Sequence, residues 1–235
     1  MKRIGFIGGY DKADLVLYIG KMLVEMGNSV LIVDATTLQR TKYIVPTIKP
    51  EDSYVTNFEG IDVAVGYYNF DEIKQGLGLP QSAPINYSVI LLDCDLPDDV
   101  ENFGVEQFDQ KFFVTSFDMY SIRKGIEALK GFVEPTPVTR ILFSRNSNKK
   151  DDEYLKYLTK DVNVQWNEET IYFPFEMGDQ TAMYNNQKVS KIKLGNLSSQ
   201  YKEQLIYVTY KILQGIGQDD YESLKRVAKK MQKGV

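Results

Sequence analysis

The stretch from Lys2 to Asp34 constrains the fold more than any other part of the chain. It divides into an apolar run, a loop that begins with two glycines, a segment with apolar residues at helical spacing and a second apolar run, at residues 3–7, 8–14, 15–26 and 30–33. This order predicts a strand–loop–helix–strand unit, the building block of a parallel sheet. The loop after the first strand of such a unit is a frequent anion site, because the unpaired N–H groups and the dipole of the helix point toward it.

The loop carries part of a phosphate-binding motif. Gly8 and Gly9 allow close approach of the backbone, and Lys12 is long enough to reach a phosphate. A working P-loop reads G-x-x-x-x-G-K-[ST], with a glycine before the lysine and a hydroxyl after it for Mg²⁺. Here Asp11 stands at the glycine position and Ala13 at the hydroxyl position. The motif is therefore incomplete at two positions.

Carboxylates stand where phosphate oxygens would bind. Asp11 and Asp14 have the spacing of an acidic capping box, so we expect Asp11 to accept the first N–H groups of the helix. A loop that caps its own helix with a carboxylate repels phosphate. The loop thus favours a nucleotide-binding scaffold whose nucleotide chemistry is impaired or lost. The alternative is an ordinary strand-to-helix loop that contains a lysine.

Composition narrows the function classes. The 235 residues include no His and a single cysteine, Cys94, which excludes His-dependent nucleophile systems, His-ligated metals and a disulfide framework within the chain. The net charge of −4 makes nucleic acid an unexpected partner. We find neither a signal peptide nor an apolar stretch long enough to span a bilayer, so we expect a cytoplasmic protein. Without an internal repeat or a low-complexity linker, we expect one domain over residues 1–235.

The later chain repeats the alternation of strands and helices. We predict strands near 63–65, 86–94, 111–115, 140–144 and 170–173, and helices near 70–75, 119–130, 154–158 and 198–213. The run at 86–94 is the most apolar, so it should be central and covered on both faces. Asp93 then lies near the carboxyl end of that strand, where open α/β sheets bind ligands. The fold class is α/β in three layers, with a mostly parallel, twisted sheet and helices on both faces.

Two charged segments each allow two interpretations. Residues 93–109 hold seven acidic side chains and no basic one, which fits either a solvated face or a switch-like loop at the mouth of the site. In residues 219–235, apolar side chains recur at helical spacing among lysines and an arginine, which predicts a basic amphipathic helix. We expect this helix to pack on its own domain, and the alternative is peripheral contact with an anionic membrane, at its inner face.

Taken together, these segments resemble the MinD/ParA family of P-loop ATPases, the group with a deviant Walker A motif. The family loop reads KGGxGKT, and residues 7–13 here read IGGYDKA. The two glycines and the second lysine match. The signature lysine, which in the family reaches the partner's nucleotide across a dimer, falls on Ile7, while Asp11 and Ala13 replace the glycine and the hydroxyl. The resemblance therefore implies a P-loop that is degenerate at these three positions.

The resemblance extends along the whole chain. The family's aspartate after the second strand falls on Asp34, its Walker B aspartate on Asp93, and its adenine-contacting asparagine on Asn146. The family's VVT-x-P-x-x-x-S segment resembles residues 113–121, and its A-x-N-x-G-x-P run resembles residues 182–188. In an active member these matches imply that Lys12 contacts the phosphates, Asp93 holds Mg²⁺ through water and Asp34 orients the attacking water.

Family members use ATP to switch between monomer and dimer, and they position or assemble cellular machines. Because the departures fall on the catalytic loop, we predict a non-hydrolysing adaptor, positioning or assembly factor that forms a homodimer, binds a protein partner and needs no cofactor. One alternative is a weak Mg-ATPase of the same family. Another is a Rossmann-type dinucleotide-binding protein, although its G-x-G-x-x-A motif requires glycine where Tyr10 stands.

Overall fold

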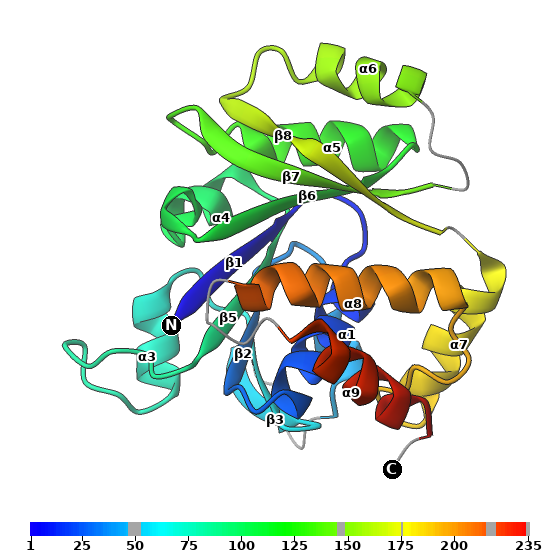
Figure 1. Ribbon diagram of the computed structural model, residues 1–235. Helices are drawn as coiled ribbons and strands as arrows, with labels where there is room; N and C mark the ends of the chain where they lie inside the picture. Colours follow the sequence, from blue (N-terminus) through cyan, green and yellow to red (C-terminus); the bar gives the residue numbers. More distant parts are fainter. Residues whose placement is uncertain (47–52, 145–148, 175, 215–219, 234–235) are drawn as a thin grey trace.

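The computed structural model describes residues 1–46, 53–144, 149–174, 176–214 and 220–233, and one eight-stranded sheet runs through it (Figure 1). Its strands are β1 Lys2–Ile7, β2 Val30–Asp34, β3 Tyr54–Phe58, β4 Ile61–Val65, β5 Val89–Cys94, β6 Gln110–Ser116, β7 Thr136–Phe143 and β8 Val164–Phe173. The order across the sheet is β3-β4-β2-β5-β1-β6-β7-β8. All neighbouring strands are parallel except β3 and β4, which pair antiparallel at one edge.

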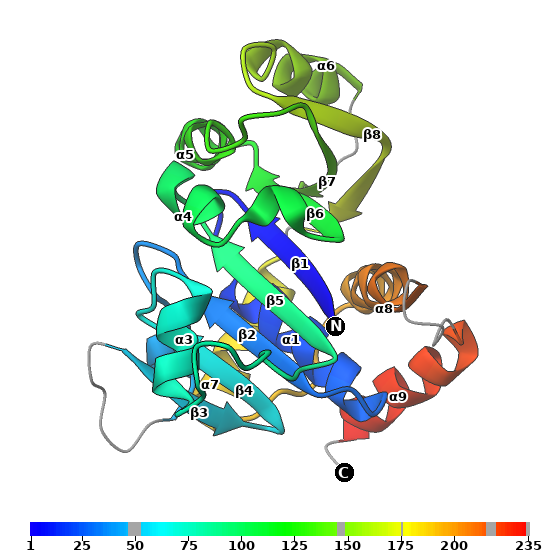
Figure 2. The same cartoon turned by 90° about the vertical axis from the view of Figure 1, so that its left-hand side faces the viewer.

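Helices cover both faces of this sheet (Figures 1 and 2). They are α1 Ala13–Glu25, α2 Thr41–Ile44, α3 Phe70–Gly76, α4 Pro97–Asn102, α5 Met119–Leu129, α6 Lys149–Leu158, α7 Met177–Lys188, α8 Ser199–Leu213 and α9 Tyr221–Lys233, with a 3₁₀ turn at Val105–Gln107. Buried residues of α1, α7, α8 and α9 form one core, and those of α3, α4, α5 and α6 form the other. The predicted three-layer α/β fold is confirmed.

Strand β5 shows how the sequence produces two cores. All six of its residues are buried. Val89 and Leu91 belong to the core beneath α1 and α8, whereas Ile90 and Leu92 belong to the core beneath α4 and α5. Because successive side chains of a strand point to opposite faces, a strand covered on both sides must be apolar at every position. Its central place between β2 and β1 matches the prediction.

Several elements lack a clear signal in the sequence, and α4, α7, β8 and β3 show why. Helix α4 begins at Pro97, within the acidic run at residues 93–109, where no apolar spacing indicates a helix. Helix α7 buries only Asp179, Ala182 and Met183, so it has no apolar stripe. Strand β8 begins at Val164, before the predicted start at residue 170. Its first half lies at the sheet edge, where exposed and partly buried residues alternate, so this half forms no continuous apolar run that would predict a strand. The hairpin strand β3 was not predicted either, and most of its residues are only partly buried.

The C-terminal helix α9 lies against α8 and α1 (Figures 1 and 2). Its apolar face is formed by Leu224, Ala228 and Met231, all buried in the core beneath α1 and α8. Its basic side chains include Lys225, Arg226, Lys229 and Lys230. The apolar face therefore contacts the protein itself. No described helix has both the length and the apolar character that crossing a membrane requires.

Candidate functional site

The β1–α1 loop lies at the carboxyl end of β1, beside the ends of β2 and β5. Gly8 has φ +143°, and a Cβ there would lie 2.2 Å from the carbonyl oxygen of Val114 on β6. A Cβ on Gly9 would lie 2.5 Å from the side chain of Lys124 on α5. Both glycines are thus required by close packing within the chain, because no larger residue fits without displacing backbone or side-chain atoms.

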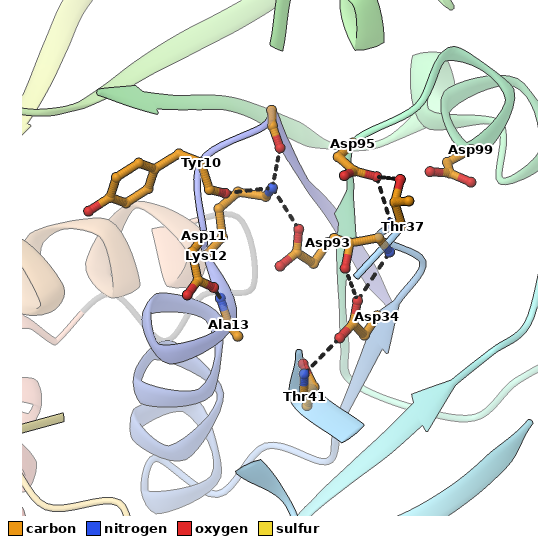
Figure 3. Close-up of polar contacts among 12 residues, drawn as sticks. Tyr10, Asp11, Lys12, Ala13, Asp34, Thr37, Thr41, Asp93, Asp95 and Asp99 are labelled. Atoms are coloured by element: carbon orange, nitrogen blue, oxygen red, sulfur yellow. Dashed lines mark hydrogen bonds and ion pairs between the residues drawn. The ribbon is translucent and has the colours of Figure 1, made fainter. Parts of the chain in front are cut away.

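Lys12 points back into this loop, at the N-terminus of α1 (Figure 3). Its side chain is almost fully buried, and Nζ donates hydrogen bonds to the carbonyl oxygens of Gly8, at 2.5 Å, and Tyr10, at 3.2 Å. Nζ also forms an ion pair with Oδ1 of Asp93, at 2.9 Å. Three oxygens therefore surround the ammonium, two as hydrogen-bond acceptors and one as an ion-pair partner.

Lys12 and Asp93 form a buried ion pair. Burial by itself lowers the pKa of Lys12, but the charge and hydrogen bond of Asp93 outweigh it and raise the pKa overall. For Asp93 burial has the opposite effect and raises the pKa; Lys12 lowers it in part, and the nearby Asp34 adds to the rise. Lys12 therefore remains protonated, and it is the cation that compensates the negative charge at the end of β5.

Asp34, at the end of β2, organises the loop that follows it (Figure 3). Its Oδ1 accepts hydrogen bonds from the amide and the hydroxyl of Thr36, at 3.1 and 2.6 Å, and its Oδ2 accepts one from the amide of Thr41, at 3.0 Å. Asp95 accepts from the amide and the hydroxyl of Thr37, at 2.8 and 2.9 Å. Two buried carboxylates thus hold residues 36–41 against the site.

Asp11 accepts one of the N–H groups at the start of α1, which is only part of the capping expected from the sequence. Its Oδ1 accepts a hydrogen bond from the amide of Ala13, the first residue of α1, at 3.2 Å. Its Oδ2 forms an ion pair with Arg40, at 2.5 Å. The expected reciprocal capping box is absent, because Asp14 does not turn back to the loop. Its Oδ2 instead accepts a hydrogen bond from Gln187 on α7, at 2.9 Å.

These groups surround a cavity of about 230 Å³. Its lining includes the carboxylates of Asp11, Asp34, Asp93 and Asp95 and the cations of Lys12 and Arg40. Both cations are paired with carboxylates. The cavity therefore combines an excess of negative side chains with no unpaired cation among its described lining residues.

The structure brings together most of the residues that the sequence singled out. Gly8, Gly9, Lys12, Asp34 and Asp93 all line this cavity, as do Asp11 and Ala13. Ile7 does not, because it is fully buried in the core beneath α3, α4 and α5. Asn146 lies outside the described residues. Sequence reasoning missed Arg40 and Thr36, which line the cavity, and Thr37, which donates to the lining residue Asp95; all three lie in a loop that carries no motif.

The topology separates the two nucleotide-binding folds that the sequence allowed. In the dinucleotide-binding order, the second strand lies beside the first. Here β5 lies between β1 and β2, and it pairs with both of them in parallel. This order argues against the Rossmann-type alternative.

Solved structures support the same conclusion. A ParA family ATPase from Chlorobium tepidum TLS matches over 88% of this chain and 97% of its own, with a TM-score of 0.54 and 14% identity. The MinC:MinD cell division protein complex from Aquifex aeolicus matches over 92% and 96%, with a TM-score of 0.55 and 14% identity. The fold is that of the MinD and ParA ATPases.

A third solved structure has the same fold. A putative plasmid partition protein from Borrelia burgdorferi B31, solved with AMPPNP, covers 92% of this chain and 99% of its own, with a TM-score of 0.52 and 15% identity. By sequence, neither a protein-family model nor a curated protein matches the chain. The fold is therefore shared, while the residues that carry the chemistry have to be judged on this chain alone.

Proposed function

We propose that this protein uses the MinD/ParA fold without hydrolysing ATP, as an adaptor, positioning or assembly factor that acts through a protein partner. The observation that carries the proposal is the state of Lys12, whose ammonium is bound by Gly8, Tyr10 and Asp93. In this account the ion pair with Asp93 replaces the phosphate that a P-loop lysine would bind.

Three features of the loop support the absence of ATP binding. Freeing Lys12 would leave Asp93 buried without its cation, so the carboxyl would either keep an uncompensated charge or have to take up a proton; losing one partner of a buried pair costs about 3–5 kcal/mol. The amide of Ala13, which would otherwise face an anion, already donates to Asp11. Ala13 also lacks the hydroxyl that holds Mg²⁺ in a P-loop. These residues do not fit a magnesium–triphosphate complex, so we assign no reaction step to one.

The proposal of a protein partner rests on the fold and on the surface at the end of the sheet. MinD of Aquifex aeolicus has been solved as a complex with MinC. On this chain the loop at residues 36–41 is held in place by hydrogen bonds to the side chains of Asp34 and Asp95. We propose that this fixed loop and the neighbouring end of the sheet present the binding surface, in a homodimer.

A weak Mg-ATPase is the second candidate, and one observation favours it. Lys12, Asp34 and Asp93 line the same cavity, as the resemblance requires for contacts with phosphate, the attacking water and Mg²⁺. The two candidates differ in what must happen to the pair between Lys12 and Asp93. It stays closed in the adaptor and must open in the ATPase.

Calorimetry with millimolar ATP and Mg²⁺ separates the two candidates. The adaptor should release no binding heat, whereas the ATPase should bind, and Lys12→Ala should abolish that binding. Lys130→Ala, which changes an exposed lysine at the end of α5, is the matched control. ATP binding to the unmodified chain that is lost in Lys12→Ala and kept in Lys130→Ala would end the adaptor proposal.

A gain-of-function variant tests the loop directly. Asp11→Gly with Ala13→Thr removes the carboxylate that occupies the helix N-terminus and supplies the missing hydroxyl, so Mg²⁺-dependent ATP binding should develop. Asp11→Gly with Ala13→Val is the control, because valine has nearly the shape of threonine without its hydroxyl. If the threonine variant gains nothing, these two positions do not explain the loss of nucleotide binding.

A further inference from the structure

A second and larger cavity lies beside the loop, on the other side of Tyr10. It has a volume of about 610 Å³ and lies where β6, β7 and β8 end, between α1, α7 and α8. Figure 3 shows the ring of Tyr10 pointing away from Asp34 and Asp93, and this ring lines the second cavity. A volume of this size is typical of small-molecule sites.

One wall of this cavity, the aromatic wall, consists of Tyr10, Phe143 and Tyr201. Tyr10 stacks on Phe143 with ring centroids 4.4 Å apart, and Phe143 also contacts Tyr201, at 6.4 Å between centroids. Phe143 and Tyr201 are buried, so they hold the partly exposed Tyr10 in a fixed orientation. Tyr184 on α7 also lines the cavity, and its side chain is exposed.

The polar part of the lining has one sign of charge. Its acidic residues are Asp11, Asp14, Asp118, Glu176 and Asp179, and no described lining residue is basic. Several of these carboxylates have structural partners: Asp118 caps α5, and Asp179 accepts from the amide and hydroxyl of Ser198.

Asp14 is different, because its only described hydrogen-bond donor is the neutral Gln187. Burial raises the pKa of Asp14 to about 6, and the nearby Asp11 adds to this rise, while Gln187 and Arg40 oppose it. At neutral pH Asp14 is therefore a carboxylate in a poorly solvated position, and it forms no ion pair with any residue that the structure describes. An arriving cation would compensate this charge.

We propose that the second cavity binds an organic cation, an ammonium or guanidinium group, with its charge against Asp14 and Glu176 and its body against the aromatic wall. Phe143 is stacked between Tyr10 and Phe173, so the rings that can present a face to a cation are those of the partly exposed Tyr10 and the exposed Tyr184. The face of an aromatic ring attracts cations, and an adjacent carboxylate adds to that attraction. The excess of carboxylates repels phosphate, so the same lining disfavours a nucleotide. This inference goes beyond the adaptor proposal, because it concerns a different cavity and does not depend on the state of Lys12.

The cation has two possible sources, which the same chemistry would recognise. One is a free polyamine, and the other is an arginine side chain that a protein partner inserts. Calorimetry with spermidine and with the peptide acetyl-Gly-Arg-Gly-amide distinguishes them. We expect binding of one probe, weakened by salt, and no binding of the matched peptide acetyl-Gly-Gln-Gly-amide.

Three variants locate the binding. Glu176→Gln and Tyr184→Ala change exposed residues of the lining, and Asp14→Asn removes its poorly solvated charge. Each should weaken the binding of the cation by roughly threefold or more, the scale of a single cation–aromatic or charge contact. Glu153→Gln, an exposed carboxylate on α6 outside the cavity, is the control and should leave binding unchanged. Melting temperatures show whether each variant is folded.

Failure of this inference is distinct from failure of the adaptor proposal. If neither probe binds, or if both bind the three variants as tightly as the unmodified chain, no cation site exists in this cavity. If adenosine binds there, and Tyr184→Ala weakens it while the cations do not compete, the cavity is a nucleoside site and the inference is overturned. Neither result depends on whether ATP and Mg²⁺ bind at Lys12.

Discussion

Replacing Asp14 with asparagine should stabilise the protein at neutral pH. The folded state raises the pKa of Asp14 from 3.8 to about 6, chiefly through burial. A shift of about 2 units corresponds to about 3 kcal/mol, since one unit is 1.36 kcal/mol. Partial exposure of the side chain reduces this figure, so we expect a gain of about 1–3 kcal/mol at pH 7.5 for Asp14→Asn. Asparagine keeps an oxygen that can accept the hydrogen bond from Gln187.

The contribution of Asp14 to the free energy of unfolding should fall as the pH rises. Because the folded state binds the proton of Asp14 more tightly than the unfolded state, the contribution of Asp14 to stability is complete below pH 3.8 and is lost as the pH rises to about 6. Urea unfolding at a series of pH values from 4 to 7.5 should show this loss in the unmodified chain and a flatter profile in Asp14→Asn. Asp71→Asn, at an exposed aspartate of α3, is the control.

The result that would refute this reasoning is a variant whose pH profile runs parallel to that of the unmodified chain. Burial of Asp14 would then not be the source of the raised pKa. If the gain in stability is found together with weaker cation binding, the residue trades stability for binding, as functional sites commonly do.

Other predictions concern the loop and the tail. Gly8→Ala should cost more than about 2 kcal/mol in urea unfolding, because its Cβ would lie 2.2 Å from the oxygen of Val114; a neutral result would show that the loop can move. Lys12→Met should cost about 3–5 kcal/mol by leaving Asp93 uncompensated, and adding Asp93→Asn should recover much of the loss; no recovery would mean that the pair is not the cause. Deleting residues 220–235 should lower the melting temperature by exposing the core beneath α9, and the deletion should not change co-sedimentation with anionic liposomes. A loss of co-sedimentation would establish membrane contact by the tail.

The sequence predicted the sheet well where the strands are central. The apolar runs that became β1, β2 and β5 favour strands, because each is short, rich in apolar residues and bounded by loop residues. Prediction failed at the edges. The first half of β8 and most of β3 are only half covered, so their residues do not have to be apolar. Helix α7 was not predicted for a related reason. Its buried Asp179 accepts a hydrogen bond from Ser198, so the buried face of the helix is not an apolar stripe.

The sequence singled out some of the residues that line the candidate site, and it did not predict their contacts. Position in the chain placed Lys12 after one strand and Asp93 near the end of another, but only the order of the sheet makes β1 and β5 neighbours. The partners of Asp34 and Asp95 lie in the loop at residues 36–41, whose path depends on tertiary hydrogen bonds. The second cavity left no trace in any single motif, because its lining comes from segments far apart in the sequence.

The place of β5 also has a consequence for how this chain acquires its structure. β1 and β2 are close in the chain and yet never pair, because β5 must enter between them and bonds to both. In the register of β1 and β5, Lys2 lies opposite Val89. The middle of the sheet therefore cannot form during synthesis until the ribosome has made β5. Until then β1 and β2 each expose an edge that will later pair with β5. Unpaired strand edges of this kind are bound by chaperones or associate with other chains.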